Sequence, residues 1–313
     1  MSTIRTAVIG VGYLGKFHAQ KYADLPDSDL VAVCDNNLDT AEKIASELGT
    51  RAVANCTQIL DEIDAVSIVV PTQKHYAIAK QCLLAGKHVL LEKPMTTTVA
   101  EAQELVQLAA DKQCVLQIGH LERFNPAVLA LDSVLTQPLF IESHRVAPFN
   151  PRGADVNVIL DLMIHDIDII LDIVGAPVKS ISAKGVAVLS RDIDIANARL
   201  EFETGCVANV TASRAGMKSE RKMRLFQHDA YISLDFQNKK LGIHRKGDKE
   251  VYPGVASIDS KEEVFEQGDA LRAEIVSFLQ CINSGAKPRV SGEDGMRALE
   301  TAMAITRLLS EQH

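Results

Sequence analysis

Short apolar runs alternate with amphipathic stretches over the first 120 residues. The apolar runs span residues 6–10, 30–35, 65–70, 88–92 and 114–119, and helical patterns such as LDTAEKIASELG lie between them. Strands that alternate with helices are typical of right-handed crossovers, which pair the strands in parallel and cover both faces of the sheet. The pattern therefore predicts an α/β domain with a doubly wound parallel sheet at residues 1–120.

The pattern changes after residue 120. Apolar and polar positions nearly alternate over residues 195–202, 206–213, 221–228, 230–236 and 240–246, with Gly, Asp or Asn turns between these runs. A period of two is typical of antiparallel strands. We therefore predict a second, α+β domain at residues 121–313, with an open, mostly antiparallel sheet and a closing helix in the last segment, residues 291–313.

One apolar segment, residues 160–175, contains a histidine and several aspartates. On a helix that turns about 100° per residue, Asp161, His165, Asp168 and Asp172 form a narrow polar band between apolar flanks. Such a band favours a helix that lines a cleft. Asp161 and His165 are four residues apart and can touch, and a neighbouring carboxylate orients an imidazole that accepts a proton. Taken alone, the band also fits a buried histidine bonded to Asp161, with Asp168 and Asp172 in solvent.

Composition narrows the class of protein. The 313 residues are 47% hydrophobic and 24% charged, with a formal net charge of −8. An acidic chain is a poor partner for nucleic acid or an anionic membrane, since both require clustered Lys and Arg. No apolar stretch reaches the roughly 18 residues of a membrane span, and no secretory signal opens the sequence. We predict a cytoplasmic protein without nucleic-acid or membrane partners.

The six cysteines show no C-x-x-C pair and no metal-finger spacing. This distribution predicts free thiols in a reducing compartment. Zinc is also disfavoured at residues 160–175, because no second histidine follows His165 at i+4 and no cysteine joins it. We therefore predict no metal site.

The first turn reads GVGYLG and has the G-x-G-x-x-G spacing of a dinucleotide-binding loop, directly after a predicted strand. Gly10 permits the tight turn, Gly12 lets the backbone approach a pyrophosphate, and Gly15 lets the helix pack close to the strand. The helix start also offers free N–H groups to phosphates. Asp35 ends the second strand, where its carboxylate can accept from ribose hydroxyls and repel a 2′-phosphate. The loop, with Tyr13 and Leu14 inside it, therefore predicts NAD as cofactor.

Two later strand ends add polar residues to the same predicted edge. Pro71, Thr72 and His75 follow the run at 65–70, Glu92 ends the run at 88–92 and Lys93 follows it. Ligands of open α/β sheets bind at the carboxyl ends of the strands, so we predict that these five residues contact the cofactor. The alternatives are a helix N-cap for Thr72, a surface position for His75 and a solvated loop lysine at Lys93.

The glycine turn, the E-K-P at residues 92–94 and the D-x-x-x-H at residues 161–165 together resemble the Gfo/Idh/MocA family of sugar and polyol oxidoreductases. The resemblance covers essentially the whole chain. It implies a Rossmann domain followed by a sheet domain whose open face packs against another subunit, hence a homodimer or homotetramer. It also implies catalytic roles for Lys93, Asp161 and His165. The chain departs from the frequent D-x-G-x-H pattern, because no glycine lies between Asp161 and His165.

Within the family, residues 119–128, 161–171 and 213–236 most resemble enzymes that oxidise the 3-hydroxyl of UDP-N-acetylglucosamine to a ketone. In that setting a partner aminotransferase converts the ketone to the 3-amino sugar of 2,3-diamino lipid A in lipopolysaccharide. The resemblance thus implies an NAD-dependent dehydrogenase acting on a CH–OH group.

The residues themselves suggest a mechanism. Oxidation of an alcohol by NAD needs a base for the hydroxyl proton and an acceptor for the hydride. Our hypothesis is that His165 takes the proton, Lys93 positions and polarises the same oxygen, and Asp161 orients the imidazole.

A UDP-sugar brings a diphosphate, which basic side chains must hold. We predict that the substrate is bound by Arg123, Asn125, Arg145, Arg214 and Lys218, with Asp155 and Asn157 at the sugar hydroxyls. The alternative for the basic run at 214–224 is a solvated strand pair with alternating charge. Two other functions stay open: a dehydrogenase of another sugar, a UDP-sugar acid or a cyclitol, and a non-catalytic NAD-binding regulator. Lys93, Asp161 and His165 argue against the regulator, which would not require them.

Overall fold

The computed structural model describes residues 3–150, 156–265 and 268–311 of the chain. The chain divides into two compact units. Unit 1 comprises Met1–Leu121 and Asp269–Leu299, and unit 2 comprises Glu122–Gly268 and Glu300–His313. The long last helix begins in unit 1 and ends in unit 2, so each unit is described by itself.

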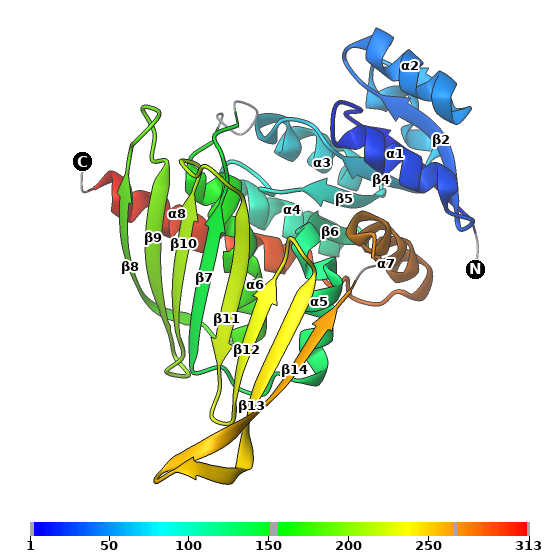
Figure 1. Cartoon of the computed structure of the whole chain (residues 1–313). Helices are drawn as coiled ribbons and strands as arrows, with labels where there is room; N and C mark the ends of the chain where they lie inside the picture. The colour runs from blue at the N-terminus through cyan, green and yellow to red at the C-terminus, as the bar shows by residue number, and fades with distance from the viewer. Residues whose placement is uncertain (1–2, 151–155, 266–267, 312–313) are drawn as a thin grey trace. The chain divides into compact units, whose positions relative to one another are not determined.

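Unit 1 is built on a six-stranded parallel sheet with the order β3-β2-β1-β4-β5-β6 (Figure 1). Its elements are β1 (Ile4–Ile9), α1 (Gly15–Asp24), β2 (Ser28–Cys34), α2 (Leu38–Leu48), β3 (Arg51–Val53), β4 (Ala65–Ile68), α3 (His75–Leu84), β5 (His88–Glu92), α4 (Val99–Asp111), β6 (Leu116–Gly119), α7 (Ala270–Ser284) and α8 (Gly292–Ser310). The order reverses between β1 and β4, as in dinucleotide-binding sheets. The predicted doubly wound sheet is confirmed.

Helix α7 is part of the unit 1 core, although the pattern analysis did not predict it. Ile275 and Phe278 are fully buried and pack in one cluster with Val8, Val33 and Leu90 of the parallel sheet. The helix has ordinary boundary signals, because its N-cap aspartate accepts a backbone N–H and a left-handed glycine follows its last residue. A segment far along the chain thus completes the first unit.

Unit 2 is built on an eight-stranded sheet with the order β14-β13-β12-β11-β7-β10-β9-β8. Its elements are α5 (Pro126–Leu129), β7 (Phe140–Val146), a π-helical turn η7 (Ile159–Met163), α6 (Ile164–Val174), β8 (Val178–Val186), β9 (Ile195–Phe202), β10 (Val207–Ser213), β11 (Glu220–Phe226), β12 (Ala230–Asp235), β13 (Lys240–Tyr252) and β14 (Val255–Val264). The β7–β10 pair is parallel and the other neighbours are antiparallel. The predicted mostly antiparallel sheet is confirmed, with β7, β8 and β14 beyond the predicted strands.

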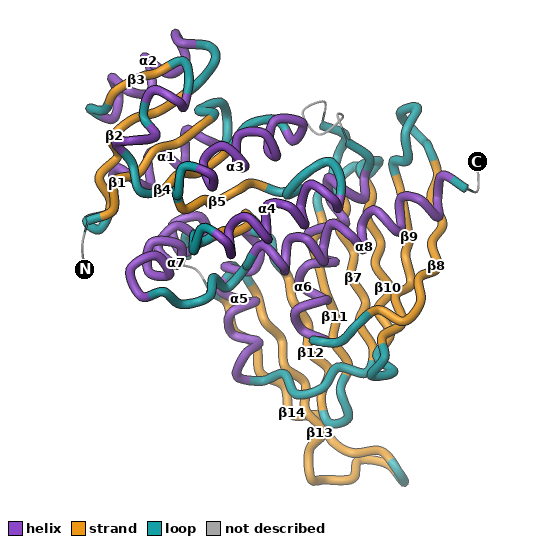
Figure 2. Tube along the Cα trace, turned by 180° about the vertical axis from the view of Figure 1, so that it is seen from behind, coloured by secondary structure: helices purple, strands orange, loops and turns teal. Residues whose placement is uncertain are grey.

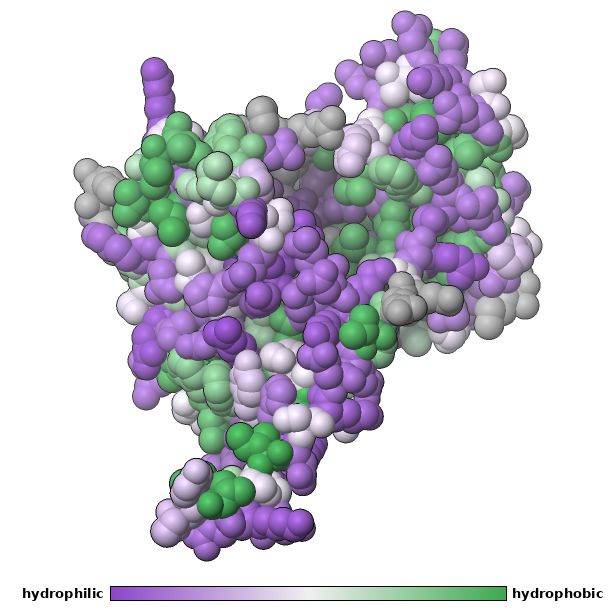
Figure 3. All heavy atoms as spheres, in the orientation of Figure 1, coloured by the Kyte–Doolittle hydropathy of each residue, from purple (hydrophilic) through white to green (hydrophobic). Residues whose placement is uncertain are grey.

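The two faces of this sheet differ. Helices α5 and α6 lie on one face (Figure 2), where η7 and α6 contact β10 and β7. Burial alternates along strand β9: Ala198 and Leu200 are fully buried, whereas Asn197 and Arg199 are exposed. On the other face hydrophilic side chains are frequent, and hydrophobic ones gather at two places, the β8–β9 end of the sheet and the tip of the β13–β14 hairpin (Figure 3). Val251, Tyr252, Val255 and Ile258 are exposed apolar residues of the hairpin.

Candidate active site

The glycine turn of unit 1 has the geometry that a dinucleotide requires. Gly10 has a φ of +87°, and a Cβ there would lie 2.3 Å from the Val69 carbonyl oxygen. A Cβ on Gly15 would lie 1.8 Å from the Gly10 carbonyl oxygen. A Cβ on Gly12 would meet no protein atom within 4 Å, so this backbone faces open space. Two glycines are thus needed for the fold, and Gly12 leaves room for a ligand.

Asp35 stands beside this turn at the end of β2. Its carboxylate accepts from the Val11 N–H at 3.0 Å and from the Asn37 N–H at 2.9 Å. A cavity of about 310 Å³ opens here. It is lined by Ile9, Gly10, Gly12, Cys34, Asp35, Asn36, Ala54, Asn55, Cys56, Val69, Val70, Pro71, Lys74, Ile78 and Gln81. The open glycine backbone and the fixed carboxylate in one cavity fit the adenosine half of NAD.

Tyr13 and Leu14 are exposed in the same turn, with 70% and 38% of their surface accessible. Thr72 begins a short 3-10 turn and is half-buried. Its side chain caps no helix there, because the N-cap position is occupied by Pro71 without a side-chain hydrogen bond. The N-cap alternative for Thr72 is therefore wrong, while its predicted contact with the cofactor stays a prediction.

The buried side chain of His75 is hydrogen-bonded to two loops. Only 1% of its surface is accessible, so the alternative of a surface position is wrong. Its Nδ1 lies 2.9 Å from the Pro94 carbonyl oxygen and its Nε2 lies 2.8 Å from the Val70 carbonyl oxygen. Burial lowers the pKa of His75, although both carbonyls act in the opposite direction. The side chain thus fixes the loop after β4 against the loop after β5.

Lys93 follows β5 at the same sheet edge and is half-buried. Its backbone N–H donates to the Glu92 Oε2 at 3.3 Å, and the peptide bond to Pro94 is cis. Glu92 is bonded in turn to His18 of α1, with 3.2 Å between Oε1 and Nε2. Sequence reasoning missed His18, whose only signal was that it lies four residues before Tyr22, on the same face of the helix that follows the glycine turn.

In unit 2, Asp161 and His165 lie where a π-helical turn passes into α6. The Ile164 N–H donates to the Ile159 carbonyl five residues earlier, so the regular helix predicted over this segment is wrong at its start. Both Asp161 and His165 are half-buried. Single π-helical turns inside α-helices are frequent at functional sites, because they shift side chains out of the regular register.

The other aspartates of α6 bind arginines. Asp172 Oδ1 lies 2.6 Å from Arg123 Nη2, and Asp168 Oδ1 lies 3.5 Å from Arg123 Nη1. Asp168 is 2% exposed, so the alternative that it lies in solvent is wrong. Asp166, which the polar band omitted, is bonded to Arg145 Nε at 3.0 Å and Nη2 at 2.8 Å. The charges on this helix are therefore largely structural.

Most of the predicted substrate-binding residues also have partners inside unit 2. Arg145 additionally donates to Glu122 at 3.1 Å. Asn125 caps α5 through the Ala127 N–H and donates to the Phe236 carbonyl. The buried Asn125 and Arg145 thus already have several hydrogen bonds each.

Arg214 and Asn157 hold the entry to α6. Arg214 Nε donates to Asp194 at 2.8 Å, and its Nη1 donates to the Val156 carbonyl at 2.9 Å. The Asn157 side chain accepts from the Ile159 and Leu160 N–H groups of η7 and donates to Thr306 at 3.3 Å. Lys218 is exposed. Asp155 lies outside the described residues.

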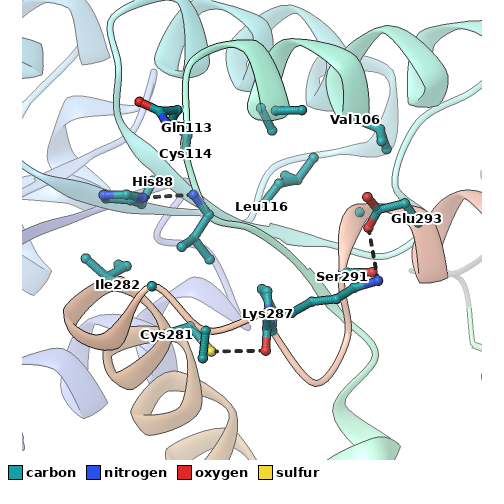
Figure 4. A pocket seen from close by; sticks show the side chains of 17 residues that line it. His88, Val106, Gln113, Cys114, Leu116, Cys281, Ile282, Lys287, Ser291 and Glu293 are labelled. Carbon is teal, nitrogen blue, oxygen red and sulfur yellow. Dashed lines mark hydrogen bonds and ion pairs between the residues drawn. The ribbon is translucent and has the colours of Figure 1, made fainter.

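A second cavity of unit 1, about 410 Å³, lies at the opposite edge of the parallel sheet (Figure 4). His88 begins β5 there and accepts from the Val115 N–H at 2.9 Å, and Cys281 donates to the Lys287 carbonyl. It contains none of the predicted site residues, although it is larger than the cavity at the glycine turn. Because dinucleotides bind at the carboxyl ends of parallel strands, we assign the cofactor to the smaller cavity.

Two further observations concern the described residues alone. No helix among them is long and apolar enough to cross a membrane. No group of three or more His, Cys, Asp or Glu side chains in the described ranges is arranged to hold a metal ion.

Two family models match successive parts of the chain. Residues 4–120 match the oxidoreductase family with an NAD-binding Rossmann fold, and residues 134–233 match the GFO/IDH/MocA C-terminal domain. UDP-N-acetylglucosamine 3-dehydrogenase of Acidithiobacillus ferrooxidans is 42% identical over 97% of both chains. A solved structure of that enzyme has a TM-score of 0.93, with 41% identity over 99% of this chain and 98% of its own. Inositol 2-dehydrogenase of Rhizobium meliloti is 25% identical over 99% of this chain and 98% of its own. This chain therefore belongs to the Gfo/Idh/MocA family of NAD-dependent oxidoreductases.

Proposed function

We propose that this protein oxidises the 3-hydroxyl of UDP-N-acetylglucosamine to the 3-keto sugar with NAD. The observation that carries the proposal is the 42% identity to UDP-N-acetylglucosamine 3-dehydrogenase over nearly the full length of both chains. Similarity of this extent includes the substrate-binding unit, where enzymes of one family differ most when their substrates differ. The cavity at the glycine turn supports binding of the cofactor in unit 1.

The proposed chemistry divides between three side chains. NAD, when bound, supplies the hydride acceptor. His165 takes the proton of the substrate hydroxyl, Asp161 orients its imidazole, and Lys93 holds and polarises the same oxygen. The fixed backbone around Lys93 and the half-buried positions of Asp161 and His165 support these roles. Tyr13, Leu14, Thr72 and Glu92 are proposed to contact the cofactor.

The diphosphate of the substrate needs positive side chains that are not already engaged. Arg123, Arg145 and Arg214 are buried and each is paired with a carboxylate, which offsets the positive charge that a phosphate would need. The exposed Lys218 fits this role best among the predicted residues. We propose that Lys218 contacts the diphosphate and that the three arginines mainly hold unit 2 together.

The setting of the reaction is part of the proposal. A 3-keto sugar is a substrate for amination, so an aminotransferase would consume the product, as in the synthesis of 2,3-diamino lipid A for lipopolysaccharide. We propose a cytoplasmic homodimer or homotetramer that assembles through the open face of the eight-stranded sheet. Light scattering of the purified protein measures the number of subunits directly.

The test is a panel of substrates with NAD. UDP-N-acetylglucosamine, UDP-glucuronate, free N-acetylglucosamine and myo-inositol are each incubated with enzyme and NAD, and NADH absorbance is followed. Hydroxylamine is included to trap the ketone, so that an unfavourable equilibrium does not hide turnover. We expect NADH only with the UDP-N-acetylhexosamine. Turnover of inositol without any UDP-sugar would contradict the proposal.

A cyclitol dehydrogenase is the second candidate. Inositol 2-dehydrogenases are 25–27% identical to this chain over 97–99% of its length, which makes the inositol arm of the panel informative. A non-catalytic regulator would bind NADH and turn over none of these compounds.

A further inference from the structure

A buried chain of polar side chains ends at the backbone of Lys93. Glu92 Oε2 accepts the Lys93 N–H, while Glu92 Oε1 is bonded to His18 Nε2. His18 is 1% exposed, and its Nδ1 lies 3.3 Å from the Ser67 hydroxyl. The Tyr22 hydroxyl lies 2.8 Å from the same Ser67 oxygen. The chain therefore runs from α1 through the end of β5 to the residue that we place in catalysis.

The position of Glu92 is sterically restricted. A Cβ on Gly119 would lie 3.0 Å from the carboxyl carbon and from both carboxyl oxygens of Glu92. The carboxylate therefore rests on the bare backbone of the neighbouring strand β6, and any larger residue at 119 would displace it. Between Gly119 and His18, the Glu92 side chain has little freedom to change its rotamer.

A second carboxyl group lies near Glu92 without sharing its hydrogen bonds. Glu274 of α7 is fully buried, and its carboxyl oxygens have no hydrogen-bond partner among the described residues. Burial first, and the charge of Glu92 second, raise the pKa of Glu274 well above its ordinary value. Burial thus favours the neutral form of Glu274, and the carboxyl group that is bonded to both His18 and the Lys93 N–H is that of Glu92.

The loop after Lys93 is held from the other side. His75 lies between the Val70 and Pro94 carbonyls, so the residue directly after Lys93 is also bonded to a buried imidazole. The Lys93 backbone is thus fixed by a carboxylate on one side and a histidine on the other. Fixing the backbone of a catalytic lysine restricts where its ammonium group can reach.

Helix α1 gives the His18 contact a second consequence. The helix begins at Gly15, the last glycine of the cofactor turn, and His18 is in its first turn. The same imidazole therefore connects the helix whose N-terminus would hold the cofactor phosphates with the strand end that is followed by Lys93. A shift of α1 would therefore move His18 and change the position of the Glu92 carboxyl group that is bonded to it.

We propose that Glu92 is a positioning residue for Lys93 and that its bond to His18 couples the cofactor-binding helix to the catalytic lysine. This inference rests on the proposed function in so far as Lys93 acts on the substrate hydroxyl. The coupling to the cofactor does not depend on the identity of that substrate.

The test compares Glu92→Gln and His18→Gln with Tyr22→Phe. Tyr22→Phe removes the outer hydroxyl of the same buried chain and leaves the Glu92–His18 contact in place. NADH binding is measured by fluorescence, kcat and KM with UDP-N-acetylglucosamine, and Tm by calorimetry. We expect Glu92→Gln and His18→Gln each to lower kcat by about 10- to 100-fold, with a KM for the sugar within about twofold. We also expect each to weaken NADH binding about fivefold, a change that falls within ordinary coupling energies.

The double variant Glu92→Gln/His18→Gln decides between positioning and a general loss of structure. Because both residues act through one contact, their effects on kcat should not add. The kcat of the double variant should be close to that of the single variant with the lower kcat. Additive losses that follow Tm, or unchanged kcat in Glu92→Gln, would overturn the proposal. Should UDP-N-acetylglucosamine not react at all, the proposed function fails, whereas the NADH measurements still test the coupling. Equal NADH affinity in all three single variants would then reject it.

Discussion

The cofactor edge of unit 1, which is formed by the carboxyl ends of the parallel strands and the loops after them, and helix α6 of unit 2 both place acids and histidines in apolar surroundings. The two regions differ in which groups form hydrogen bonds with these side chains. At the cofactor edge, Asp35 bonds to the backbone of Val11 and Asn37, and His75 bonds to the backbone of Val70 and Pro94. On α6, Asp166 bonds to a side chain from strand β7. One region is stabilised by turn geometry and the other by long side chains from elsewhere.

This difference shows at which positions the role of a polar residue can be predicted from the sequence. Backbone partners are supplied by the turn itself, so a residue after a strand can be interpreted from its position. An aspartate on a helix can meet solvent, a substrate or an arginine, and the residue type does not distinguish them. Of the four residues in the predicted polar band, Asp168 and Asp172 are paired with Arg123, which leaves Asp161 and His165 as the half-buried pair.

The largest expected effect is on kcat, and it distinguishes the proposed catalytic residues near α6 from the residues that stabilise unit 2. His165→Asn should lower kcat by about 10²- to 10⁴-fold, because it removes the proposed proton acceptor. NADH affinity and Tm should stay near those of the wild type. Steady-state kinetics with fluorescence titration measures both. Lys93→Met is the matching variant at the cofactor edge, and a kcat within about threefold of wild type for either residue would contradict its role.

The next effect concerns stability. Arg145→Met leaves the buried Asp166 without its partner, so the free energy of unfolding should fall by about 3–5 kcal/mol. Arg245→Met is the matched control, because its ion pair with Asp229 is exposed, and it should cost about 1 kcal/mol or less. Urea unfolding measures both variants. Equal losses would mean that the buried pairs of unit 2 are no more important than surface pairs.

A third experiment uses the buried acid below the cofactor edge. The pKa of Glu274 is raised in the folded protein by burial and by the charge of Glu92, so its contribution to stability is fully present below its unfolded pKa. That contribution is lost as pH rises toward the folded pKa, at about 1.4 kcal/mol per pH unit. Glu274→Gln stays neutral at all pH. The Tm of the variant relative to wild type should therefore rise as pH increases above the ordinary glutamate pKa, and a constant difference would contradict a raised pKa of Glu274.

The smallest effect concerns the glycine turn. Gly12→Val adds a side chain where the protein leaves open space, so Tm should be unchanged while NADH binding weakens about tenfold, about 1.4 kcal/mol. Gly10→Val should instead destabilise the fold, because its side chain would meet the Val69 carbonyl. Fluorescence titration and calorimetry distinguish the two. Weaker NADH binding with an equal loss of Tm in Gly12→Val would remove the distinction between ligand space and packing.

Much of unit 1 could be predicted because its information is local. The G-x-G-x-x-G turn, the acid at the end of β2 and the polar residues after β4 and β5 each follow a short apolar run, and parallel strands bring those ends to one edge. His18 and Glu274 could not be found this way, since neither follows a strand. They face Glu92 only because α1 and α7 pack against the sheet.

Unit 2 was predictable in class but less so in detail. Alternation identified antiparallel strands, yet it gave no register, so it could not say that Arg145 of β7 reaches α6 or that Arg214 reaches the Val156 carbonyl. The π-helical turn before α6 was also missed, because a single inserted residue barely disturbs an apolar pattern over five residues.

By itself, the sequence determined the fold class, the cofactor turn and the position of Lys93, because periodicity and turn chemistry are properties of neighbouring residues. Only the tertiary structure decided the partners of the buried charges. Burial makes an unpaired charge costly, so each one needs a partner, but the partner is selected by which segments pack together and not by proximity along the chain. Arg123, Arg145 and Arg214 were predicted as substrate ligands, and the folded chain gave each of them a carboxylate.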